Sequence, residues 1–197
     1  MSNYQINETE EMITILDFLR FSLSYAHKAE LYYGHGTDNA WDDIFCLILG
    51  SLKLPLDIDP IYLQTNLTMP EKQFLTAQLK KRILEHVPVP YLTNEAHFAG
   101  HTFYVDERVL IPRSPFAELI EQRFSPWVEA DHVHQVLDLC TGSGCIAISC
   151  AYAFPEAHVD GVDISPEALE VANKNVMAHH LRRSRHHYPI ECLGPCA

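Results

Sequence analysis

Two aspartates lie on either side of a glycine-rich turn in the second half of the chain. Asp138 stands four positions before Gly142, and Asp163 stands nineteen positions after Gly144. Glycines let a backbone turn tightly from a strand into a helix and approach a ligand without a Cβ in the way. The N–H groups at the start of that helix then face the crevice. The run from Gly142 to Ala147 also fits the G-x-G-x-x-A pattern of dinucleotide sites, which is a weak signal by itself.

The two carboxylates distinguish between classes of cofactor. Asp138 would repel a pyrophosphate and attract a cation. S-adenosylmethionine carries an ammonium and a sulfonium and no phosphate, so Asp138 favours it over NAD. Asp163 is placed to accept hydrogen bonds from ribose hydroxyls, a feature that NAD sites share. An NAD-type oxidoreductase therefore stays the alternative, and the purely structural alternatives are a loop-capping role for Asp138 and a turn role for Asp163.

The elements around these residues predict an α/β domain. The apolar run 136–139 lacks alternation, which is typical of a buried strand in a parallel sheet. We expect a helix over 145–154, a second strand over 158–162 and a second helix over 166–179, with Pro166 at its favoured first position. Strand, glycine turn, helix, strand and helix is the opening of a doubly wound, Rossmann-like sheet.

Residues 1–90 predict an N-terminal helical domain. We expect helices over residues 8–28, 41–52 and 68–85. The apolar stripe of the first is expected to contain Ile13, Leu16, Leu19 and Leu23. Thr68 and Glu71 have the spacing of a capping box at the start of the third helix, which is expected to bury Phe74. Residues 91–134 predict a hairpin near 97–105 and a connecting segment.

Composition excludes several classes. The formal net charge of −12 disfavours binding to nucleic acid phosphates. No apolar run approaches the roughly 20 residues of a membrane helix, and the polar, acidic N-terminus is unlike a signal peptide. The six cysteines are therefore expected to be reduced thiols of a cytoplasmic protein, because disulfide frameworks belong to oxidising compartments.

Several motifs resemble one known family. Val109-Leu-Ile-Pro-Arg113, Leu137-Asp-Leu-Cys-Thr-Gly-Ser-Gly144 and Val162-Asp-Ile-Ser-Pro-Glu-Ala-Leu169 resemble the protein N5-glutamine methyltransferases, over about residues 1–180. Tyr32–Asn39 and Tyr104–Leu110 resemble the branch that acts on a large-subunit ribosomal protein. The resemblance implies an S-adenosylmethionine-dependent enzyme that transfers a methyl group to a glutamine side-chain nitrogen, and it makes the helical domain a substrate-recognition domain.

The resemblance also implies roles for individual residues. The cofactor would be bound by Asp138, Cys140, Thr141, Gly142, Ser143, Gly144 and Asp163. Arg113, in Pro112-Arg-Ser-Pro115, is the candidate on the substrate side, with a rigid linker as the alternative role of that segment. In the family, an Asn-Pro-Pro-Tyr loop positions the glutamine amide, and the 197 residues do not contain it. The sequence therefore offers no catalytic residue.

The resemblance stops at about Leu181. Residues 135–181 would be the first half of the methyltransferase domain, and residues 182–197 are expected to be an aberrant, disordered tail of a truncated and inactive product. A non-catalytic fragment that binds the ribosomal protein is the alternative. Four residues of the tail could ligate zinc, namely His186, His187, Cys192 and Cys196, but their spacing is unlike structural zinc sites, so we expect no metal.

Overall fold

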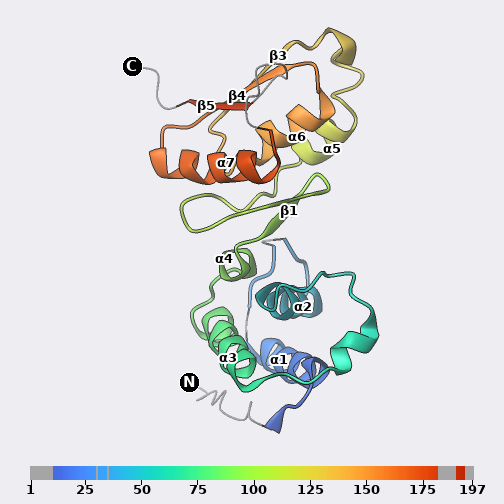
Figure 1. The fold of residues 1–197 in the computed structure, drawn as a ribbon, viewed down its shortest axis with the longest axis vertical. Coiled ribbons are helices and arrows are strands. Elements are labelled where there is room, and N and C mark those ends of the chain that lie inside the picture. Colours follow the sequence, from blue (N-terminus) through green and yellow to red (C-terminus); the bar gives the residue numbers. More distant parts are fainter. Residues whose placement is uncertain (1–10, 30, 35, 182–189, 194–197) are drawn as a thin grey trace. The chain divides into compact units, whose positions relative to one another are not determined.

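The computed structural model describes residues 11–29, 31–34, 36–181 and 190–193, and it divides into two compact units at Thr93 and Asn94. We call residues 1–93 unit 1 and residues 94–197 unit 2 (Figure 1). Unit 1 contains α1 (Ile15–Lys28), α2 (Ala40–Ser51), the 3₁₀ helix η2 (Pro60–Gln64), α3 (Met69–Leu84) and α4 (Val89–Thr93). Unit 2 contains β1 (Ala96–Phe98), β2 (His101–Phe103), α5 (Phe116–Glu121), η3 (Ala130–His132), β3 (Gln135–Leu139), α6 (Cys145–Ala153), β4 (His158–Val162), α7 (Pro166–Ala178) and β5 (Ile190–Leu193).

Local sequence signals fix where the helices of unit 1 begin. Thr68 and Glu71 form the expected capping box, in which the Thr68 hydroxyl accepts from the Glu71 N–H and the Glu71 carboxylate accepts from the Thr68 N–H. Thr14 and Asp17 form a second capping box at the start of α1. Both α1 and α3 therefore start after a residue whose side chain satisfies a backbone donor that the helix itself leaves unpaired.

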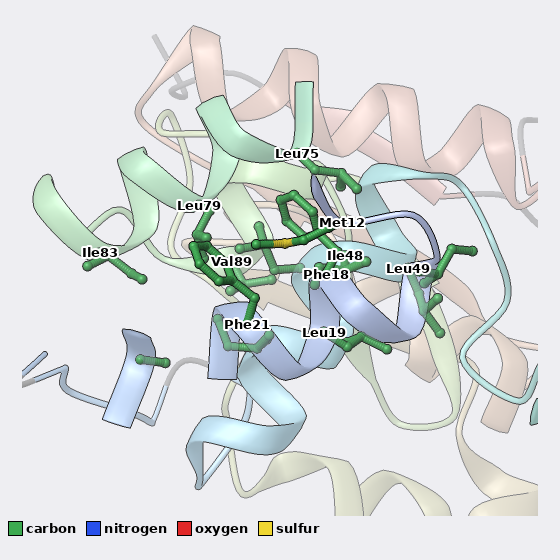
Figure 2. Packing of buried hydrophobic residues seen from close by; sticks show 14 of the residues in the cluster. Met12, Phe18, Leu19, Phe21, Ile48, Leu49, Leu75, Leu79, Ile83 and Val89 are labelled. Atoms are coloured by element: carbon green, nitrogen blue, oxygen red, sulfur yellow. The ribbon is translucent and has the colours of Figure 1, made fainter. Parts of the chain in front are cut away.

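The core of unit 1 lies between α1, α2 and α3. Figure 2 shows Phe18, Leu19, Ile48, Leu49 and Leu79 among its apolar side chains, and each of these five residues is almost fully buried. Burial of this kind is the dominant favourable term in folding.

The expected apolar stripe of α1 was partly wrong. Ile13 and Leu16 are exposed, whereas Ile15 and Phe18 are buried. The reason is that Ile13 precedes the helix in an extended segment, where its carbonyl accepts from the N–H of Leu67 at 2.8 Å. Phe74, expected to be buried in α3, is exposed as well.

One buried ion pair joins α2 to α3. Arg82 Nε donates to Asp43 Oδ2 at 2.7 Å, and the two side chains are only 4% and 6% exposed. The guanidinium also donates to the carbonyl of Tyr32 at 3.1 Å, and Asp43 accepts from the hydroxyl of Thr37 at 3.1 Å. The pair therefore fixes the loop that leads into α2.

Unit 2 is built on a parallel sheet with the strand order β3-β4-β5. Leu137 pairs with Asp160 and Val162 pairs with Leu193 in the register of these strands. The helices α5, α6 and α7 lie on one face of this sheet in Figure 1. The expected boundaries of β4 and of the helices after β3 and β4 agree with the structure to within one residue.

Two expectations about the sheet need correction. The strand β3 is not fully buried: Leu137 and Leu139 are 59% and 67% exposed, because no described helix covers their face and no described strand pairs with the second edge of β3.

Residues 190–193 lie in the segment that we expected to be disordered, yet their backbone pairs with the free edge of β4, whose N–H and C=O groups need partners. The rest of that segment lies outside the described residues.

Candidate functional site

The loop between β3 and α6 folds tightly because three of its residues have positive φ. These angles are 61° at Cys140, 56° at Gly142 and 78° at Gly144, which is the N-cap of α6. The N–H of Gly144 donates to the Thr141 carbonyl at 2.9 Å, and the Thr141 N–H donates to the Val162 carbonyl at 3.0 Å. The loop therefore lies at the carboxyl ends of β3 and β4, where doubly wound sheets bind ligands.

Asp138 lies under this loop. Its Oδ2 atom accepts from the Thr141 hydroxyl at 2.6 Å and from the N–H of Ala147 at 3.2 Å. Burial raises the pKa of Asp138, the two hydrogen bonds partly oppose that rise, and the charge of Asp163 adds to it. A positive charge nearby would stabilise the ionised form of this carboxylate.

Asp163 follows β4 and binds two backbone donors. Its Oδ2 atom accepts from the N–H of Gly142 at 2.9 Å, and its Oδ1 atom accepts from the N–H of Ser165 at 2.9 Å. Both aspartates therefore hold loops, as their structural alternatives predicted. A carboxylate oxygen has two lone pairs, so each oxygen of Asp163 can still accept from a ligand hydroxyl.

Space around the loop differs from one glycine to the next. A Cβ on Gly142 would meet nothing within 4 Å, so its backbone faces open space. A Cβ on Gly144 would lie 3.3 Å from the Cβ of Ala172, and one on Gly161 would lie 3.0 Å from the Thr141 hydroxyl oxygen. A ligand can approach the loop at Gly142, whereas Gly144 and Gly161 are needed for packing.

The remaining residues of the predicted site have different environments. Cys140 is exposed, whereas Thr141 and Ser143 are buried and belong to the framework of the loop. Arg113 is exposed in the segment before α5, and among the described residues no hydrogen bond or ion pair joins it to the loop. The structure thus brings together all the predicted cofactor residues and leaves Arg113 outside that set.

Sequence reasoning missed two residues of the framework. Gly161 lets Thr141 pack closely enough to reach Asp138. Asn175 is buried on α7, and its side chain binds the Ser143 carbonyl at 2.8 Å. A polar residue on the apolar stripe of a helix, in line with Ala168 and Ala172, was the available signal.

Cysteine and metal chemistry receive no support from the described residues. Burial raises the pKa of the Cys145 thiol to about 11 and that of Cys150 to about 12, so both stay protonated near neutral pH. No group of three or more His, Cys, Asp or Glu residues in the described part of the chain could hold a metal ion. Of the four zinc candidates, His186, His187 and Cys196 lie outside the described residues, as does the side chain of Cys192. No helix in the described ranges is long and apolar enough to cross a membrane.

Comparison with known proteins finds similar sequences over most of the chain. Residues 122–190 match the methyltransferase small domain family. The ribosomal protein uL3 glutamine methyltransferase of Neisseria meningitidis is 50% identical over 168 residues, which are 85% of this chain and 55% of that protein. The Neisseria gonorrhoeae protein of the same name is 49% identical over 168 residues, with coverages of 85% and 56%. The chain thus spans about half the length of these curated relatives.

A solved structure is a more distant match. The N-terminal domain of human METTL16 in complex with SAH has a TM-score of 0.34 and 14% identity, over 70% of this chain and 49% of that one. A likeness this loose carries no argument. Over 168 of its residues, the chain is therefore similar to curated proteins named ribosomal protein uL3 glutamine methyltransferase, and its residues 122–190 are similar to the methyltransferase small domain.

Proposed function

We propose that this chain binds S-adenosylmethionine and ribosomal protein uL3 as part of a cytoplasmic protein-glutamine N-methyltransferase. The observation that carries the proposal is the buried carboxylate of Asp138 beside the open backbone of Gly142. Burial makes the ionised form of Asp138 costly, and a cationic ligand would offset that cost. A pyrophosphate would instead place further negative charge beside the Asp138 carboxylate.

Each part of the site would have a separate task. Asp138 would favour the cationic methionine end, and Asp163 would accept from the ribose hydroxyls with its remaining lone pairs. The loop 140–144 would lie against the ligand at Gly142, where no side chain intervenes. S-adenosylmethionine supplies an electrophilic methyl group when bound. An amide nitrogen is a weak nucleophile, so the protein must contribute mainly orientation and electrostatics.

The residues that would orient the glutamine amide are the open part of this proposal. The family places them in an Asn-Pro-Pro-Tyr loop, and these 197 residues lack that sequence. We therefore expect a polypeptide of these residues to bind ligands without transferring the methyl group. Arg113, exposed after the buried Ile111 and Pro112, is the residue of this chain that we propose for the substrate side.

The direct test is calorimetric titration of the chain with S-adenosylmethionine and, separately, with NAD. We expect S-adenosylmethionine to bind and NAD not to bind. Asp163→Ala should weaken binding by about 1–3 kcal/mol, the cost of leaving buried polar groups without a partner. Asp160→Ala is the matched control, since that carboxylate lies on β4 beside His158, at 3.0 Å, and not at the loop. Preferential NAD binding would support the oxidoreductase alternative.

Substrate recognition needs its own test. Co-precipitation of purified uL3 with the 197-residue chain should succeed, because we assign the helical unit 1 to recognition. A radiolabelled transfer assay on the same mixture should give no methylated uL3. Capture without transfer supports the proposal, whereas turnover above the control without the chain would require another amide-binding loop within these residues.

A further inference from the structure

The side chain of Asn175 makes three hydrogen bonds to residues outside α7. Its Oδ1 atom accepts from the N–H of Tyr104 at 2.7 Å. Its Nδ2 atom donates to the carbonyl of Tyr104 at 2.9 Å and to the carbonyl of Ser143 at 2.8 Å. The residue is 1% exposed. A carboxamide has one acceptor oxygen and two N–H donors, so this environment uses both donors and the acceptor.

Tyr104 begins a segment that lies along α7, and we call residues 104–108 the strap. The Nζ atom of Lys174 lies 3.0 Å from the centroid of the Tyr104 ring. Arg108 at the other end of the strap donates to Glu170 at 2.8 Å. The strap therefore advances from position 175 of α7 towards position 170, in the direction of the N-terminus of that helix.

The N-terminus of α7 is next to the proposed cofactor site. Ser165 is the N-cap of α7, and its N–H donates to Asp163 at 2.9 Å. The strap thus runs towards the carboxyl end of β4, and the segment 109–115 with Arg113 follows it. Figure 1 shows the hairpin and the chain after it beside α7, within the same unit.

The second contact of Asn175 is with the cofactor loop itself. Ser143 is 2% exposed, so its carbonyl has little access to water and needs the Asn175 donor. One turn earlier on α7, Ala172 packs so closely against Gly144 that a Cβ on Gly144 would lie 3.3 Å from the Ala172 Cβ. The same face of α7 therefore fixes the position of residues 143–144 and, through Asn175, that of the strap.

We propose that Asn175 is a positioning residue that couples the cofactor loop to the strap, so that filling the cofactor site orders the strap and the Arg113 segment that follows it. The proposal rests on the proposed function, because the ligand is S-adenosylmethionine or its product. The Asn175 side chain hydrogen-bonds both the loop 141–144 and the strap. Loss of Asn175 leaves the carbonyl of Ser143 and both backbone groups of Tyr104 without these partners.

Hydrogen–deuterium exchange on the 197-residue chain, with and without S-adenosylhomocysteine, tests the coupling. Peptides covering 137–145 and 103–109 report on the loop and the strap. In the wild-type chain, the ligand should slow exchange in both peptides. In Asn175→Leu, affinity should fall about 10-fold or more, the range expected for unsatisfied buried groups. At saturating ligand, protection should return in 137–145 and stay absent in 103–109.

Two further variants keep the test decisive. Asn173→Leu is the control on the same helix, since its side chain binds only the Leu169 carbonyl of α7, at 2.9 Å, and its exchange pattern should match the wild type. Asn175→Asp retains the acceptor for Tyr104 and loses both donors, so it replaces the leucine variant if that one does not fold. If the ligand still slowed exchange in peptide 103–109 of the Asn175 variants, the inference would be overturned and the proposed function would stand. A wild-type chain that binds no S-adenosylhomocysteine would overturn the proposed function, and the inference with it.

Discussion

Replacement of Gly144 by alanine is expected to destabilise unit 2 by about 2–5 kcal/mol. Gly144 has a φ of 78°, and an L-residue in this left-handed region costs about 1–2 kcal/mol. The new Cβ would lie 3.3 Å from the Cβ and 3.4 Å from the Cα of Ala172. Extra methyl groups in a packed interior cost about 1–3 kcal/mol, because neighbouring groups must shift.

Gly142→Ala is the matched comparison. Its φ of 56° imposes the same kind of backbone cost, but no atom lies within 4 Å of the added Cβ. We therefore expect Gly142→Ala to cost about 1–2 kcal/mol and to reduce ligand binding, because it fills the open side of the loop. The two alanine variants thus separate backbone strain from crowding.

Native-state hydrogen exchange in α6 measures this loss of stability, and exchange in α3 is the internal control in unit 1. Gly144→Ala should speed exchange in α6 and leave α3 unchanged. The double variant Gly144→Ala/Ala172→Gly should recover part of the loss, because it removes the closest Cβ, although a helical glycine costs about 1 kcal/mol. Equal losses in Gly142→Ala and Gly144→Ala, or strictly additive effects of the Gly144 and Ala172 changes, would refute the reasoning.

Three other predictions concern single side chains. Burial raises the pKa of Asp138 in the folded chain above the unfolded pKa of about 3.9. As pH rises through the interval between these two pKa values, Asp138 ionises and the fold loses stability. Asp138→Asn should therefore stabilise unit 2 in urea titrations at pH 7, by a margin that vanishes at pH 3, while it weakens S-adenosylmethionine binding; a loss of stability at pH 7 would contradict this. Arg82→Met should destabilise unit 1 by about 3–5 kcal/mol, because it leaves Asp43 buried without its partner, and Arg82→Met/Asp43→Leu should regain much of that in thermal unfolding. In a chain completed with the C-terminal part of a relative, Arg113→Ala should lower the rate of methyl transfer with unchanged cofactor affinity, and an unchanged rate would make residues 112–115 a linker.

Much of the fold could be predicted because its signals are local. The capping box of Thr68 and Glu71 needs only residues three apart, and it set the start of α3 correctly. The face of α1 was harder, because it depends on the pairing of Ile13 with Leu67, more than fifty residues away. The exposure of Leu137 likewise depends on which elements cover the sheet, and the strand sequence does not contain that information.

The site divides in the same way. Asp138, the loop glycines and Asp163 could be recognised because their spacing along one strand–turn–helix–strand unit carries the signal. Asn175 could not, because its partners Tyr104 and Ser143 are 71 and 32 residues away. The residues proposed to bind the cofactor were therefore visible in the sequence, whereas Asn175, which holds their loop, became visible only in the folded structure.

The division of the chain at Thr93 also has a consequence for synthesis on the ribosome. The capping boxes and the Arg82–Asp43 pair join residues within the first 93, so none of these contacts waits for later sequence. At translation rates of about 5–20 residues per second, residues 94–197 take about 5–20 s to follow. The helical unit can complete its core during that interval. A nascent chain would then present its proposed recognition unit to a newly made ribosomal protein before the rest of unit 2 has been translated.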